Sequence, residues 1–222
     1  MKYSIIVPVF NRPDEVDELL QSLCSQELKD FEVIIVEDGS KKPCKDVCDK
    51  YAGILDLHYY FKENSGPGQS RNYGAEHAQG EWLIVLDSDV VLPNGYLTAV
   101  DERLKMKNER YDYTCDQDSN SNTNHISHLS SLISAPSAFG GPDASHPSFT
   151  PIQKAISYSM TSFFTTGGIR GGSSPKSGGV RGALDKFFPR SYNMGIRREV
   201  YQELGGFTKM RFGEDISSII NL

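Results

Sequence analysis

The chain has no long hydrophobic run, few cysteines and no excess of basic residues, and each of these absences excludes a class of protein. No apolar stretch reaches the roughly 18 residues that a membrane-spanning helix needs. The opening segment, MKYSIIVPVFNR, has too short an apolar part for a secretory signal peptide. The formal net charge of −6 disfavours nucleic acid as the main partner. We therefore expect a cytoplasmic protein with no transmembrane segment.

The four cysteines do not form a zinc or disulfide pattern. Cys44 and Cys48 are spaced i, i+4 with no pair of histidines nearby, and Cys24 fits the buried face of a helix. We interpret all of them, Cys115 included, as reduced thiols. The chain also lacks the G-x-x-x-x-G-K-[ST] loop, which argues against a P-loop NTPase.

Residues 1–110 alternate between short apolar runs and amphipathic segments. This alternation, with short connections, predicts an α/β domain with a Rossmann-like parallel sheet flanked by helices. Four strands are expected, at 3–9, 31–36, 57–61 and from Trp82 onward. Helices are expected at about 13–26, 43–51, 69–78 and 93–107.

The second half is less regular. Residues 114–138 are rich in Ser and Asn, which predicts a long loop, and residues 167–182 are rich in glycine. A strand is expected at 192–195 and a helix at 198–204. The basic residues of the glycine-rich stretch and just after it are either solubility charges or part of a lid over a phosphate group.

Two carboxylates follow the buried strand WLIVL directly. Asp87 and Asp89 lie two residues apart, so extended backbone directs both to the same side. They lie at the carboxyl edge of the sheet, where open α/β folds bind ligands. At about 5 Å two such charges repel by roughly 3 kcal/mol at an effective dielectric near 20, so a proton, a basic side chain or a divalent cation must offset them. Mg²⁺ or Mn²⁺ shared with a phosphate suits these oxygen ligands.

The order and spacing of several segments resemble the family 2 glycosyltransferases, which have the GT-A fold. The matching segments are SIIVPVFNR at 4–12, IIVEDGS at 34–40, NSGPGQSRNYGA at 64–75, LDSD at 86–89, NMGIRREVYQELGGF at 193–207 and FGED at 212–215. Family members normally continue beyond this point. The chain ends seven residues after Asp215, so we expect a GT-A domain truncated at the C-terminus.

The resemblance implies a single domain over 1–222 and an inverting transfer from a nucleotide-diphosphate sugar. Residues 1–110 would be the nucleotide-binding half, 111–138 an irregular insertion, and 139–222 the acceptor-side half with a flexible loop at 166–182. The donor is expected to be a UDP-sugar, and the acceptor a glycan or a lipid-linked glycan in polysaccharide biosynthesis. Peripheral membrane association at the inner face of the membrane and a homodimer are compatible with this assignment.

The same resemblance implies roles for individual residues. Asp215 matches the residue that acts as general base in catalysis. Asp89 matches the metal ligand of the D-x-D motif, and Asp38 matches the residue that recognises the nucleobase. The remaining donor-binding positions are Pro8, Phe10, Asn11, Arg12, Gly66, Arg71, Asp87 and Ser88. A divalent cation, Mn²⁺ or Mg²⁺, would be the cofactor.

Each position also has a purely structural alternative. Asp38 is followed by glycine and suits a turn, Asp87 and Asp89 could cap the next helix, and Arg71 could form a surface ion pair. Asp215 could be an ordinary acid at a helix N-terminus. At the level of the whole chain, the alternatives are a non-catalytic nucleotide-binding module of the same fold and a nucleotidyltransferase. The latter needs a lysine- and glycine-rich loop that VPVFNR does not provide.

Overall fold

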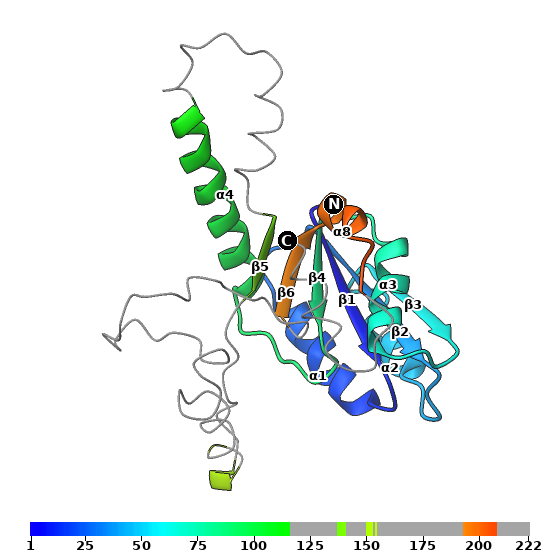
Figure 1. Cartoon of the computed structure of the whole chain (residues 1–222). Helices are drawn as coiled ribbons and strands as arrows, with labels where there is room; N and C mark the ends of the chain where they lie inside the picture. The colour runs from blue at the N-terminus through cyan, green and yellow to red at the C-terminus, as the bar shows by residue number, and fades with distance from the viewer. Residues whose placement is uncertain (116–136, 141–149, 153, 155–192, 208–222) are drawn as a thin grey trace.

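The computed structural model of the chain describes residues 1–115, 137–140, 150–152, 154 and 193–207. These residues form one six-stranded sheet in the order β3-β2-β1-β4-β6-β5, with helices on both faces (Figure 1). The strands are β1 (Tyr3–Val9), β2 (Phe31–Asp38), β3 (Leu57–Lys62), β4 (Trp82–Leu86), β5 (Ala138–Gly140) and β6 (Asn193–Arg197). The predicted α/β architecture with a mostly parallel sheet is confirmed.

The centre of the sheet consists of fully buried strands. Every residue of β2 and β4 is buried, as expected for strands covered on both faces, and in β2 this includes the acidic Glu32, Glu37 and Asp38. β1 lies between them, with Ile5 paired to Val33 on one side and to Ile84 on the other, both in parallel register. The carboxyl ends of β1, β2 and β4 therefore meet at one edge of the sheet.

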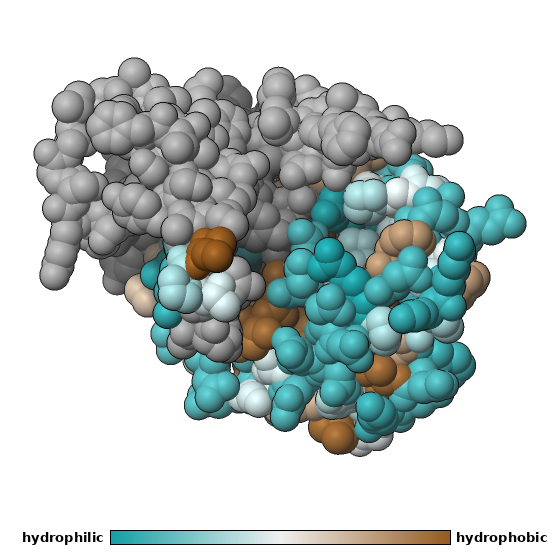
Figure 2. Space-filling view, turned by 90° about the horizontal axis from the view of Figure 1, so that it is seen from below, coloured by the Kyte–Doolittle hydropathy of each residue, from teal (hydrophilic) through white to brown (hydrophobic). Residues whose placement is uncertain are grey.

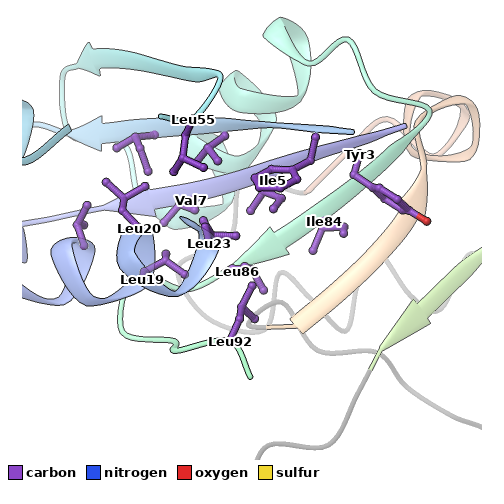
Figure 3. Packing of buried hydrophobic residues seen from close by; sticks show 14 of the residues in the cluster. Tyr3, Ile5, Val7, Leu19, Leu20, Leu23, Leu55, Ile84, Leu86 and Leu92 are labelled. Carbon is purple, nitrogen blue, oxygen red and sulfur yellow. The ribbon is translucent and has the colours of Figure 1, made fainter. Parts of the chain in front are cut away.

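One face of the sheet is covered by α1 (Pro13–Cys24), α2 (Lys45–Tyr51) and the first part of α4 (Tyr96–Cys115). The predicted i, i+3, i+4 spacing in α1 buries Leu19, Leu20 and Leu23. These side chains lie against β1 and β4 in the hydrophobic cluster shown in Figure 3. This packing fixes where the loop between β1 and α1 lies.

The other face is covered by α3 (Pro67–His77) and α8 (Arg198–Glu203). α3 approaches the sheet closely at Gly74, where an added Cβ would lie 2.5 Å from Cγ2 of Ile6. This close approach places the N-terminal turn of α3 beside the ends of β1 and β2.

Asp101 anchors α4 to the start of β1. Its carboxylate accepts hydrogen bonds from Lys2 at 2.5 Å, Tyr3 at 2.9 Å and Lys105. Burial opposes ionisation of this group, but the three donors outweigh burial and lower the pKa of Asp101 to about 2. The ionised carboxylate therefore stabilises the folded chain.

The predicted end of the fourth helix is wrong, because α4 continues to Cys115 rather than ending near Lys107. A short strand, β5, covers Ala138–Gly140. The division of the chain with an insertion at 111–138 stays a prediction. β6 lies beside β4 and antiparallel to it, a neighbour that periodicity alone did not indicate. The loop predicted at 166–182 lies outside the described residues.

Two further expectations concern membranes and cysteines. Within the part of the chain that the structure describes, no helix combines the length and apolarity needed to cross a membrane. Cys24, Cys44 and Cys48 are free thiols, and the sulfurs of Cys44 and Cys48 lie 3.9 Å apart in the core.

Candidate functional site

A cavity of about 330 Å³ opens at the carboxyl edge of β1, β2 and β4. Residues from the ends of these strands and from the start of α3 line it: Pro8, Val9, Phe10, Arg12, Asp38, Pro67, Asp87, Ser88 and Asp89. Figure 2 views the molecule from below, and hydrophilic residues cover most of the described part of that face. The cavity is where the switch from β1 to β4 in the strand order predicts a ligand site.

Asp38, the last residue of β2, holds the turn that leads into α3. Its Oδ1 accepts the backbone N–H of Ser65 and its Oδ2 that of Gly66, both at 2.9 Å. The ammonium group of Lys62 donates to the same carboxylate, and the side-chain amide of Asn64 donates to the backbone oxygen of Asp38 at 2.8 Å. Asp38 therefore has the turn role that its sequence allows, and it also lines the cavity.

The loop after β1 is fastened to the loop after β2. Asn11 has the left-handed φ of 55°, and its backbone N–H donates to Oγ of Ser40 at 2.7 Å. Its Oδ1 accepts the backbone N–H groups of Lys41 at 2.7 Å and Lys42 at 3.0 Å. Ser40 in turn donates to the buried carboxylate of Glu37. Asn11 thus supports the cavity wall from behind and does not line it.

Arg71 reaches Asp87 from the first turns of α3. Its Nη2 donates to Oδ1 of Asp87 at 3.0 Å, and its side chain is only 4% exposed. The alternative of a surface ion pair is therefore wrong. A buried guanidinium held against a cavity carboxylate places positive charge next to the ligand space.

Arg12 pairs with Asp89 across the mouth of the cavity. Its Nη1 donates to Oδ2 of Asp89 at 2.6 Å, and both side chains are about half exposed. Each of the two repelling carboxylates therefore faces an arginine, which is one of the three expected ways to offset them. The capping alternative is wrong, because the next helix does not begin until Tyr96.

The residues present fit a divalent cation held jointly by the protein and a ligand. Asp87 and Asp89 both line the cavity, and their side chains remain 40% and 52% exposed. Among the described residues no three His, Cys, Asp or Glu side chains gather into a metal site. Mg²⁺ commonly takes one or two carboxylates and completes its shell with phosphate oxygens and water, which suits this arrangement.

The structure brings most of the predicted donor-side residues together. Pro8, Phe10, Arg12, Asp38, Asp87, Ser88 and Asp89 line the cavity. Asn11, Gly66 and Arg71 contact lining residues or their neighbours. Their roles in binding stay predictions, and Asp215, the predicted base, lies outside the described residues.

Sequence reasoning missed Lys62, Val9 and Pro67. Lys62 contacts the carboxylate of Asp38, while Val9 and Pro67 contribute apolar wall to the cavity. The signal for Lys62 was its register at the end of β3, where it pairs directly with Asp38 of β2. Side chains of directly paired residues lie on the same face of a sheet, so that pairing alone would have suggested the contact.

Several known proteins are similar to this chain in sequence. The sequence model of the family described as Glycosyl transferase family 2 matches residues 4–205. The poly(ribitol-phosphate) beta-N-acetylglucosaminyltransferase TarS of Staphylococcus aureus is 38% identical over 93 residues, which are 40% of this chain and 16% of that protein. The GalNAc(5)-diNAcBac-PP-undecaprenol beta-1,3-glucosyltransferase of Campylobacter jejuni is 33% identical over 113 residues, which are 50% of this chain and 36% of that protein. The matched segments thus span well under half of these relatives.

Solved structures show the same fold. S. aureus TarS 1-349 in complex with UDP-GlcNAc superposes with a TM-score of 0.64 at 20% identity, covering 100% of this chain and 54% of that one. The mannosyltransferase PcManGT of Pyrobaculum calidifontis, in complex with GDP-Man and Mn²⁺, superposes with a TM-score of 0.55 at 17% identity, covering 97% and 50%. These neighbours confirm the predicted GT-A architecture.

Proposed function

This chain belongs to glycosyl transferase family 2, and from that membership and the cavity we propose that it transfers a sugar from a nucleotide-diphosphate donor to a hydroxyl group. The observation that carries the proposal is the convergence of Asp38, Asp87 and Asp89 on one cavity at the carboxyl edge of the sheet. The acceptor we propose is a glycan or a lipid-linked glycan in polysaccharide biosynthesis, the class to which the Campylobacter relative's name points.

The donor we propose is a UDP-sugar, the donor class named for the TarS complex. The uracil ring carries one N–H, which can donate to the carboxylate of Asp38 at the inner end of the cavity. Phe10, at the rim and half exposed, offers an aromatic face against which a base or ribose can pack. The turn at 64–66 is held by Asp38, so the base subsite is shaped before the nucleotide arrives.

The diphosphate would lie between Arg12, Arg71 and the D-x-D carboxylates. Asp89, with Asp87 beside it, would hold Mn²⁺ or Mg²⁺, and the PcManGT complex contains Mn²⁺. When bound, such a cation supplies Lewis-acid stabilisation of the charge that develops on the leaving diphosphate. The two arginines, already fixed by Asp89 and Asp87, add positive charge to the same wall without rearrangement.

The reaction we propose is a single displacement that inverts the anomeric centre. The acceptor oxygen forms its bond to the anomeric carbon while the bond from that carbon to the diphosphate oxygen breaks. Asp215 accepts the proton of the acceptor hydroxyl as general base. We place the activity in the cytoplasm or at the inner face of the membrane, where nucleotide sugars and lipid-linked acceptors meet, and propose a homodimer as the assembly.

The proposal is tested by donor hydrolysis and transfer in the presence of Mn²⁺. Wild type is compared with Asp89→Ala and with Asp49→Ala, a control that removes an exposed carboxylate of α2 whose partner is Lys45. We expect activity to fall at least tenfold in Asp89→Ala and to stay unchanged in Asp49→Ala. Equal activity in all three proteins would refute the metal role of Asp89.

A second candidate is a non-catalytic module of the same fold that binds the nucleotide and transfers nothing. It needs only the cavity, because the residues that would hold the nucleotide and the cation, Asp38, Asp87 and Asp89, all line it. Calorimetry with UDP distinguishes the two. Binding that needs Mn²⁺, together with no turnover on any acceptor, would identify the module rather than the enzyme.

A further inference from the structure

Asn72 of α3 joins the nucleotide side of the fold to the segment that follows α8. Its Oδ1 accepts the backbone N–H of Phe207 at 2.8 Å and the hydroxyl of Tyr201 at 2.6 Å. Its Nδ2 donates to the backbone oxygen of Phe207 at 2.8 Å. One amide side chain thus pairs with both backbone groups of a residue 135 positions away, in the manner of a strand pair.

Two glycines bring Phe207 to this position. Gly205 and Gly206 both have left-handed φ values, 74° and 72°, which residues other than glycine rarely adopt. A Cβ on Gly206 would also lie 2.7 Å from Oδ1 of Asn72. The turn after α8 is therefore built so that the backbone of Phe207 reaches the side chain of Asn72.

The ring of Phe207 packs against the arginine of the cavity. The guanidinium carbon of Arg71, the residue before Asn72, lies 5.3 Å from the ring centroid of Phe207. Both side chains are almost fully buried, and a desolvated contact of this kind is stronger than one at the surface. Nη2 of the same guanidinium donates to Asp87, which lines the cavity.

We propose that Phe207 is a positioning residue for the donor cavity. Held by Asn72, its ring fixes the guanidinium of Arg71 against Asp87, so that the segment after α8 completes a site otherwise built by the first half of the chain. The expected effect of Phe207 on nucleotide binding rests on the proposed function. Its effect on the position of the Arg71 guanidinium does not.

The test uses the full chain and the variants Phe207→Leu, Asn72→Asp and Phe31→Leu. Phe31→Leu is the matched control, because Phe31 is as buried as Phe207 but packs in the cluster on the opposite face of the sheet. The first readout is the rotation of the Arg71 guanidinium about its Nε–Cζ bond, measured by NMR on arginine-labelled protein without nucleotide. The second readout is the dissociation constant for UDP in the presence of Mn²⁺, measured by calorimetry. The third is the steady-state kinetics of the donor, from which the effects on KM and on kcat are obtained separately.

We expect rotation of Arg71 to become several-fold faster in Phe207→Leu and to stay at the wild-type rate in Phe31→Leu. The dissociation constant for UDP and the KM for the donor should rise by up to about 30-fold, the upper limit if the whole of a desolvated cation–π contact contributes to nucleotide binding. Because Phe207 touches no reacting group, kcat should change by less than threefold.

Unchanged rotation in Phe207→Leu would overturn the proposal, whatever happens to UDP binding. Faster rotation with no UDP binding by the wild type would refute the proposed function and leave the positioning role of Phe207 supported. If Phe207→Leu does not fold, the Asn72→Asp variant is used instead. It keeps the ring of Phe207 but replaces the Nδ2 donor of Asn72 with an oxygen that repels the backbone oxygen of Phe207. Wild-type rotation of Arg71 in a folded Asn72→Asp protein would then overturn the proposal.

Discussion

The ion pair between Asp38 and Lys62 offers the sharpest test of how the inner end of the cavity is built. The side chains of Lys62 and Asp38 are only 15% and 6% exposed. Replacing Asp38 with Asn removes the negative charge that faces the ammonium group of Lys62. It also removes one hydrogen-bond acceptor, because the amide NH₂ group cannot accept the backbone N–H of Ser65 or Gly66. Hydrogen bonds to charged groups contribute about 1.5–3 kcal/mol, and removing one partner of a buried pair costs about 3–5 kcal/mol.

We therefore expect Asp38→Asn to lower the free energy of unfolding by about 3 kcal/mol. For a chain of this size each kcal/mol shifts Tm by roughly 2–4 °C, so the melting temperature should fall by about 6–12 °C. Lys62→Met should cost less, because the carboxylate of Asp38 keeps both backbone donors. The double variant has no ammonium group left unpaired. The stability losses of the two single variants should therefore add up to about 2 kcal/mol more than the loss measured for the double variant, which is the coupling energy of the pair.

The assay is urea unfolding of the four proteins of this cycle. The matched control is the exposed pair of Lys45 and Asp49 on α2, whose oppositely charged groups lie 2.9 Å apart in solvent. A cycle of Lys45→Met and Asp49→Asn should give a coupling energy of about 0.5 kcal/mol or less. A coupling energy between Asp38 and Lys62 no larger than that of the control pair would show that the buried ion pair does not stabilise this end of the cavity.

The remaining predictions concern α4, α3 and the cavity mouth. The pKa of Asp101 is lowered to about 2, so Asp101→Asn should lower the free energy of unfolding by about 2 kcal/mol above pH 4. This difference between wild type and variant should disappear as the pH falls through 2, and a pH-independent difference in urea unfolding would contradict the prediction. Gly74→Ala should lower the free energy of unfolding by about 1–3 kcal/mol, because the added methyl group overpacks against β1. The control Gly53→Ala, which has open space around it, should change the free energy of unfolding by no more than about 0.5 kcal/mol, and thermal melts measure both. Arg12→Ala removes an exposed pair with Asp89, so Tm should change little, while calorimetry should show UDP binding weakened about tenfold, the loss of one charged contact.

The sequence was sufficient for the central sheet because burial on both faces leaves a simple pattern. The runs FEVIIV and WLIVL have few alternatives to strands covered by helices, and the leucines of α1 repeat at the helical spacing. The sequence also predicted that Asp38 and Asp87 lie at the same edge of the sheet, because each follows a parallel strand at its carboxyl end.

The parts that failed depend on contacts between distant segments. The length of α4 could not be predicted from its weakly amphipathic sequence, whose end at Cys115 has no glycine or proline to mark it. The antiparallel placement of β6 beside β4 is a matter of topology, which a five-residue strand does not encode. The contacts of Asn72 with Phe207 join residues far apart in sequence and carry no local pattern.

A crystal structure of the protein with UDP and Mn²⁺ bound would test the proposed donor site most directly. We expect the uracil ring beside Asp38, the diphosphate between Arg12 and Arg71, and the cation on Asp89. A nucleotide bound away from the cavity at the ends of β1, β2 and β4, or a cation with no contact to Asp87 or Asp89, would contradict it.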